Sequence, residues 1–251
     1  MLDFLNEKHD IYNNPSFIEL DPISVPHRYS SKEDREIAGF FAAVIAWGQR
    51  KTVLQNANRL MEWMDEDPHQ FILHHGAADL KPFSRFVHRT FNGEDCLYFM
   101  RSLKNIYTHH GGLSGVFQQA VKKKDEHVGA GLIHFRRVFF ELPHASRTEK
   151  HISSPESNSA CKRMNMYLRW MVRSDKRGVD FGIWKGIRPS QLICPLDVHS
   201  GRVARRIGIL QRSQDDWKAA LELTSKLKEY DARDPVRFDF SLFGLGVQEK
   251  F

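Results

Sequence analysis

The 251-residue sequence has few cysteines and no long hydrophobic run. Cys96, Cys161 and Cys194 form an odd set without a CxxC pair, which argues against a disulfide framework and an iron–sulfur cluster. No apolar run approaches the roughly 20 residues of a membrane span. The N-terminus, MLDFLNEKHD, lacks the basic-then-apolar layout of a signal peptide. We therefore expect a cytoplasmic protein that has no membrane partner.

Several motifs that carry chemistry are also absent. The sequence contains no GxxxxGK[ST], GxGxxG or GxSxG, so it lacks a phosphate-cradling loop and a nucleophile elbow. His74-His75 and His109-His110 are adjacent pairs, which do not share a helix face, and neither has a further ligand at i+4. His9-Asp10 is typical of metal phosphohydrolases, but it lies in a polar N-terminal tail. We expect no metal and no cofactor.

The positive charge of the chain is concentrated in one segment. Residues 162–206 contain eleven lysines and arginines and only three aspartates, a net charge of +8, whereas the whole chain carries +6. Such a concentration is the pattern expected of a surface that binds a polyanion. A basic face that is merely solvated is the alternative, and charge alone does not separate the two.

Hydrophobic periodicity is helical along nearly the whole chain, which predicts an all-α protein of about nine or ten helices. Ser30 and Glu33 suggest a capping box for the first, and Ser159 is the expected cap of a later one. We see no convincing strand alternation, and residues 144–158 and 174–194 are expected to be irregular. Helices are expected over 31–47, 49–67, 94–110, 114–124, 129–141 and 159–173, and from Asp197, Asp215 and Asp234.

Two residues combine chemistry with a special position on a helix. Asp197 follows Pro195 and precedes a helical stretch, so its carboxylate can accept backbone N–H bonds at a helix start and stay ionised. Lys162 lies in the first turn of its helix beside Arg163, where the helix dipole disfavours an ammonium and favours a nucleophilic amine. Taken singly, a structural cap and an ordinary surface lysine are the simpler interpretations.

Two stretches resemble the helix–hairpin–helix DNA glycosylase superfamily. PLDVHSGRVARRIG (195–208) is similar to the element that follows the hairpin there, an aspartate followed by a small residue, a histidine and a helical arginine. AAVIAWGQRKTVLQNANRLM (42–61) resembles the early helix pair, in which Gln49 matches a glutamine that opens the second helix. Over about residues 36–247 the chain resembles a bacterial family of unknown function.

The superfamily resemblance implies an all-α, two-lobed protein with a DNA groove. Residues 33–185 would form a helical-barrel lobe that carries Lys162, and residues 1–32 with 186–251 would form the second lobe. In bifunctional members a lysine amine attacks C1′ of a damaged nucleoside, such as an oxidised purine, while the aspartate supports the positive charge that develops on the sugar. The resemblance thus implies catalytic roles for Lys162 and Asp197 and duplex DNA as the partner of a monomer.

The sequence departs from the superfamily before Lys162. The glycine-rich hairpin is missing and HISSPESNSAC (151–161) stands in its place; 35 residues separate Lys162 from Asp197, a long spacing similar to that of archaeal-type 8-oxoguanine DNA glycosylases. Trp47 and Trp184 are candidates for a base pocket or a wedge. The candidate DNA-binding residues are Gln49, Arg50, Lys51, Ser154, Ser159, Arg163, His199, Arg202, Arg205 and Arg206.

Three functions are therefore compatible with the sequence. The first is a DNA-repair glycosylase, with or without AP-lyase activity. The second is a helical DNA- or RNA-binding protein that keeps the fold without catalysis. The third is a helical scaffold or small-molecule enzyme whose basic segment is only a solvated face.

Overall fold

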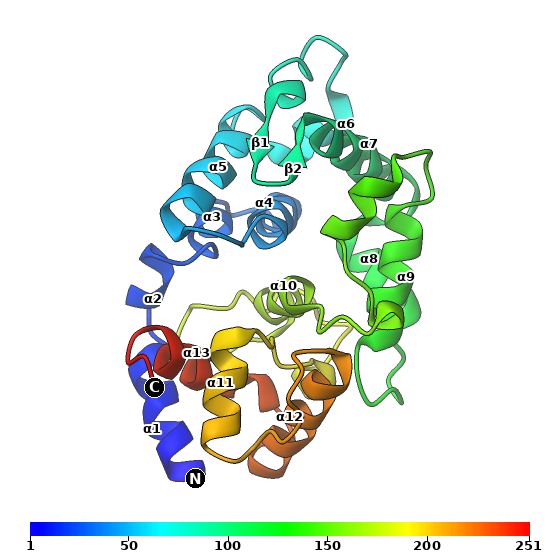
Figure 1. Ribbon diagram of the computed structural model, residues 1–251. Helices are drawn as coiled ribbons and strands as arrows, with labels where there is room; N and C mark the ends of the chain where they lie inside the picture. The colour runs from blue at the N-terminus through cyan, green and yellow to red at the C-terminus, as the bar shows by residue number, and fades with distance from the viewer. The chain divides into compact units, whose positions relative to one another are not determined.

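The computed structural model describes residues 1–251 and is mostly helical, with 60% helix and 2% strand, which confirms the all-α prediction. No helix combines the length and the apolar character that crossing a membrane requires. The α-helices are α1 (Leu2–Tyr12), α2 (Ser16–Glu19), α3 (Ser24–His27), α4 (Lys32–Val44), α5 (Arg50–Glu62), α6 (Pro68–His74), α7 (Gly93–His109), α8 (Gly112–Ala120), α9 (Gly129–Phe139), α10 (Lys162–Val172), α11 (Val198–Arg206), α12 (Trp217–Tyr230) and α13 (Asp239–Val247) (Figure 1).

Short elements fill the segments between these helices. Five 3₁₀ helices are η1 (Phe83–Arg85), η2 (Ser146–His151), η3 (Pro155–Ser157), η4 (Pro189–Gln191) and η5 (Pro235–Phe238). The two strands, β1 (Val87–His88) and β2 (Phe91–Asn92), form one antiparallel hairpin. Strands of two residues are too short to show alternation, and the sequence analysis missed them for this reason.

The chain divides into two compact units. The first unit contains residues 1–19, 121–133 and 153–251, and the second contains residues 20–120 and 134–152. The division differs from the expected lobes, because residues 153–185 belong with 186–251. Lys162 and Asp197 consequently lie in the same unit.

The second unit is built around α4 and an aromatic cluster. Phe40 of α4 contacts Phe99 of α7 at a centroid distance of 5.8 Å and Phe139 of α9 at 5.6 Å. The cap of α4 is Ser31, whose side chain accepts a hydrogen bond from the Asp34 backbone N–H, one residue after the capping box expected at Ser30. The apolar periodicity of this helix thus identified the core of the unit.

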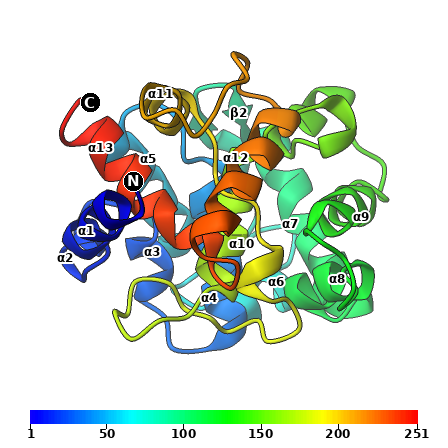
Figure 2. The same cartoon turned by 90° about the horizontal axis from the view of Figure 1, so that it is seen from below.

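In the first unit the two ends of the chain pack together, because the last helix, α13, contacts the first helix, α1. Helix α13 also contacts α11. Helices α1 and α13 lie side by side in both views (Figures 1 and 2). Leu5 and His9 of α1 are buried, so the N-terminus is a packed helix and not the polar tail expected from its sequence. A Cβ atom on Gly244 of α13 would lie 2.1 Å from the Tyr12 ring, which explains the glycine at this contact.

Candidate active site

Asp197 caps helix α11, as its position after Pro195 predicted. Its Oδ1 accepts hydrogen bonds from the backbone N–H groups of His199 at 2.9 Å and Ser200 at 3.0 Å. In return, the Ser200 hydroxyl accepts the Asp197 backbone N–H at 3.0 Å, which completes a capping box. These bonds engage Oδ1 and leave Oδ2 to face the neighbouring helix start.

Lys162 is the first residue of α10, and its amine faces that carboxylate. Nζ lies 3.5 Å from Asp197 Oδ2 and 3.7 Å from the sulfur of Met166. The side chains of Lys162 and Asp197 are 26% and 28% exposed, so both are shielded yet still open to a ligand. The structure therefore brings together the two residues that the sequence analysis selected as candidate nucleophile and carboxylate.

The backbone before Lys162 follows tight turns where the glycosylase superfamily has a glycine-rich hairpin. Cys161, with φ +49°, precedes α10 in the left-handed region and provides no side-chain cap. Ser159 is not the cap of α10, as had been expected; its hydroxyl accepts the Cys161 backbone N–H at 3.2 Å. Ser154 is buried and caps the short helix η3. The segment is therefore a series of tight turns in which neither serine is a simple substitute for a glycine-rich phosphate grip.

The surroundings of Asp197 keep it ionised. Burial raises the pKa of this carboxyl, but the Lys162 ammonium and the N–H groups of Ser200 and His199 outweigh burial and bring the pKa below its ordinary value. The helix start thus holds a fixed negative charge beside the amine at neutral pH.

A third ionisable group, Asp239, interacts electrostatically with both members of the pair. It is buried at the start of α13, and one of its oxygens accepts a hydrogen bond from Arg169. Burial raises the pKa of Asp239 to about 6; Arg169 and Lys162 oppose this rise and Asp197 adds to it. The sequence analysis missed Asp239, although a single carboxylate between the buried residues Phe238 and Phe240 was a usable signal.

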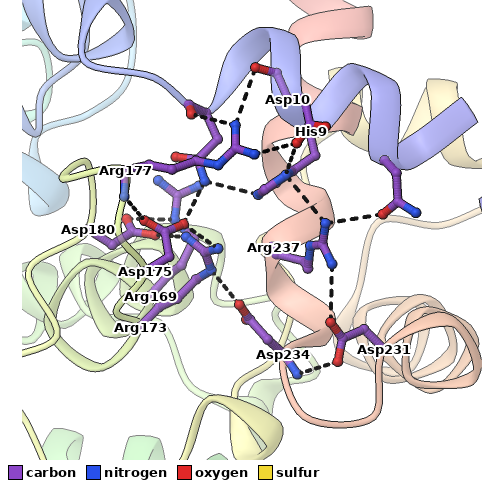
Figure 3. A network of polar contacts seen from close by, with 12 residues as sticks. His9, Asp10, Arg169, Arg173, Asp175, Arg177, Asp180, Asp231, Asp234 and Arg237 are labelled. Atoms are coloured by element: carbon purple, nitrogen blue, oxygen red, sulfur yellow. Dashed lines mark hydrogen bonds and ion pairs between the residues drawn. The ribbon is translucent and has the colours of Figure 1, made fainter. Parts of the chain in front are cut away.

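Two of the eleven basic residues in 162–206, Arg169 and Arg173, are buried. Asp180 is fully buried and accepts Arg169 Nε at 3.2 Å and Arg173 Nη1 at 3.0 Å. Arg173 also contacts Asp175 at 2.7 Å and Asp234 at 2.8 Å (Figure 3). These two arginines neutralise buried aspartates, so they cannot contact a phosphate backbone. The interpretation of the whole segment as a polyanion-binding surface is corrected accordingly.

The three arginines of α11 differ in whether an acidic side chain pairs with them. Arg205 pairs with Asp215 at 2.6 Å and donates to a backbone carbonyl, which makes it a structural residue. Arg202 donates to the carbonyl groups of Gly246 at 3.0 Å and Phe251 at 3.2 Å, and Arg206 lies 4.6 Å from the Phe251 ring centroid. Neither Arg202 nor Arg206 pairs with an aspartate or glutamate, and both are exposed.

Two other candidates on the same helices are accessible to different extents. His199, the second residue of α11, is exposed. Arg163, beside Lys162, is only partly exposed, and burial lowers the pKa of its guanidinium to about 10. Of these two, His199 is the more open to a partner that approaches the start of α11.

Trp184 lies in the core of the first unit. It is 1% exposed, and its ring meets the Tyr167 ring edge-on at 5.5 Å. A residue that inserts between bases or lines a base pocket needs an accessible ring. The assignment of Trp184 as a pocket or wedge residue is therefore corrected.

The remaining candidates belong to the second unit. Gln49 precedes α5 without a side-chain cap bond, and it is exposed together with Arg50 and Lys51. Trp47 is partly exposed, and the Arg89 guanidinium lies over it, 5.0 Å from the centroid of the Trp47 ring. These residues form a polar and aromatic group of the second unit, whereas Lys162 and Asp197 belong to the first unit.

The fold and the pair define an all-α protein in which an amine and an ionised carboxylate face each other at two helix starts. The chain belongs to the family described as "Protein of unknown function (DUF2400)", whose model matches residues 21–248. Neither the curated proteins nor the solved structures gave a significant match.

Proposed function

We propose that the protein is a DNA glycosylase of the helix–hairpin–helix type with AP-lyase activity. The observation that carries the proposal is the 3.5 Å distance between Lys162 Nζ and Asp197 Oδ2. Two groups this close can act on the same sugar carbon, and both are partly exposed. The resemblance of residues 195–208 to the glycosylase element gives the pair its chemical interpretation.

In the proposed reaction the Lys162 ammonium first releases a proton to water, and the free amine then forms a bond to C1′ of the damaged nucleoside. The C1′–base bond breaks, and its electron pair leaves with the base, which takes up the proton that the attacking nitrogen releases. The sugar ring then opens to an imine. Water hydrolyses this imine, or β-elimination expels the 3′-phosphate before hydrolysis. Asp197 stabilises the positive charge on the sugar, a role that requires it to stay ionised.

Borohydride trapping tests the lysine mechanism. Borohydride reduces an imine to a stable amine, so the wild-type protein should become covalently attached to duplexes that contain 8-oxoguanine, uracil or an abasic site. Lys162→Gln should abolish the adduct on every substrate. Lys218 is the matched control, because it is an exposed lysine in the first turn of α12, and Lys218→Gln should trap as well as the wild type.

Two results would refute this proposal. One is the absence of an adduct between the wild-type protein and any of the three duplexes. The other is an adduct that persists in Lys162→Gln, which would assign the reaction to another amine.

A second candidate function is nucleic-acid binding without catalysis. It is favoured by the exposed Arg202 and Arg206, which pair with no aspartate or glutamate, and by the missing glycine hairpin. This candidate predicts DNA binding that weakens steeply with salt and survives Asp197→Asn, with no base release from any duplex. A wild-type adduct in the borohydride experiment would exclude it.

A further inference from the structure

The first unit contains a pocket of about 640 Å³ that none of Lys162, Asp197 and Asp239 lines. Its walls come from the loop 124–127, from the segment around η4 and from the second half of α12. The volume lies in the range of about 300–1,000 Å³ that is typical of small-molecule sites. It is more space than an inorganic anion alone requires.

The walls of the pocket are held together by a buried glutamine. The Gln191 amide donates to the carbonyl groups of Lys122 at 2.9 Å and Asp125 at 3.0 Å. Its Oε1 accepts the Arg188 backbone N–H at 3.1 Å, and its own carbonyl accepts the Val128 N–H at 2.9 Å. Gln191 is 2% exposed. These four bonds fix the loop 124–127 against η4, so the pocket has a preformed wall.

Three cations line the pocket and none of them forms an ion pair: Lys124, Arg188 and Lys228. Arg188 donates to the Lys123 carbonyl at 2.6 Å, and Lys228 donates to the Glu126 carbonyl at 3.0 Å. Backbone carbonyls orient the two side chains without neutralising their charge. Arg169 and Arg173 in the same unit are, by contrast, neutralised by carboxylates.

The other polar groups of the pocket are mostly donors. His127 Nδ1 accepts the Gly129 backbone N–H at 3.1 Å, which leaves Nε2 as the nitrogen that carries the ring N–H. Ser190 and Ser225 add two hydroxyl groups. Of the two lining carboxylates, Asp125 already accepts the Lys122 N–H at 2.8 Å, and Glu126 is exposed. The pocket therefore has three cations against two carboxylates, a net charge of +1, and several hydrogen-bond donors.

We propose that this pocket binds a small phosphorylated molecule. Arg188, Lys228 and Lys124 would hold the phosphate, whose three terminal oxygens suit three separate cations better than the two oxygens of a carboxylate do. Ile193 and Leu221 supply an apolar wall for the group that the phosphate is attached to. The inference does not depend on the proposed glycosylase activity, because none of its residues belongs to the Lys162–Asp197 pair.

Isothermal titration calorimetry with three probes tests the site: inorganic phosphate, ribose 5-phosphate and adenosine 5′-monophosphate. The two organic phosphates should bind more tightly than inorganic phosphate, and adenosine, which has no phosphate, should bind at least about tenfold more weakly than its monophosphate. Failure of all three phosphate probes to bind at millimolar concentration would overturn the proposal.

Variants locate the binding in the pocket. Arg188→Gln and Lys124→Gln should each weaken binding by about tenfold, and Lys124 is the safer variant because its side chain makes no hydrogen bond or ion pair. Lys226 is the matched control, because it lies on α12 outside this pocket and pairs with Glu229. Equal affinity in Lys124→Gln, Arg188→Gln and Lys226→Gln would place the ligand elsewhere and overturn the proposal.

The same phosphate chemistry occurs in a nucleic-acid strand, so a final titration separates the two sources. The probe is a single-stranded oligonucleotide without terminal phosphates. The proposal expects that it does not compete with adenosine 5′-monophosphate. Binding of the oligonucleotide that is lost in Lys124→Gln, with no binding of the three small probes, would overturn the small-molecule assignment.

Discussion

Replacing Asp197 by asparagine and by alanine separates its charge from its role as a helix cap. Asparagine caps a helix about as well as aspartate does, so Asp197→Asn should keep the bonds from His199 and Ser200 and lose only the charge. The pair with Lys162 is partly exposed and contributes about 0.5–1 kcal/mol after solvent screening. Asp197→Ala also removes the cap, which costs about 1 kcal/mol more.

The two variants should lose activity to the same extent although their stabilities differ. If a negative charge beside the sugar is what Asp197 supplies, single-turnover base release should fall by about 100-fold or more in both variants. Urea unfolding of the same preparations gives the stability difference. The control is Asp216→Asn, because Asp216 likewise caps α12, accepting the Ala219 N–H at 3.0 Å, and also forms an ion pair, but with Arg212 and not with Lys162. It should retain full base release.

Three patterns would contradict this reasoning. The charge would be irrelevant if Asp197→Asn retained wild-type base release. If only Asp197→Ala were inactive, the residue would act through the cap. Loss of base release in Asp216→Asn would show that the assay reports the integrity of any cap in this unit.

Three further predictions concern the first unit. Asp180→Ala leaves two buried arginines without their shared partner and should lower the free energy of unfolding by about 3–5 kcal/mol in urea titrations, whereas an exposed ion pair would change it little. Burial raises the pKa of Asp239 to about 6, so the contribution of this carboxyl to the free energy of unfolding is favourable below pH 4 and is lost as the pH rises through 6. Between pH 4 and pH 6 the stability of the wild type should therefore fall relative to that of Asp239→Asn. Parallel stability profiles of the two proteins over this range would contradict the assignment. Gly244→Ala places a Cβ atom 2.1 Å from the Tyr12 ring and should lower the unfolding free energy by about 1–3 kcal/mol; an unchanged denaturation midpoint would show that α1 does not pack here.

The sequence predicted the local structure well where the pattern was long and periodic. The apolar stripes of α4, α7 and α10 identified three helices and their buried faces, and Asp197 was identified as a cap from the proline before it. Helix α1 was missed because its apolar residues lie at its two ends without a helical repeat and its buried His9 is counted as polar. A periodic pattern reports which face is apolar, and it fails where a polar side chain is buried.

The parts of the site that join distant segments could not be predicted from the sequence. Arg169 and Asp239 are 70 residues apart, and Arg173 and Asp234 are 61 apart. A net charge counted along residues 162–206 treats both arginines as free, because their partners are found only after folding. The pairing of Lys162 with Asp197 was expected from the resemblance to glycosylases, and not from the spacing of the two residues.

The buried network has a geometrical consequence for Lys162. Residues seven apart on an α-helix differ by only about 20° in direction, so Lys162 and Arg169 project from nearly the same side of α10. Arg169 is held between Asp180 and Asp239, which prevents α10 from turning about its own axis. An inserted residue between Lys162 and Arg169 would turn the amine by about 100° while the network stayed in place. The ion pairs of Arg169 near the end of α10 thus fix the direction in which the Lys162 amine projects from the start of the same helix.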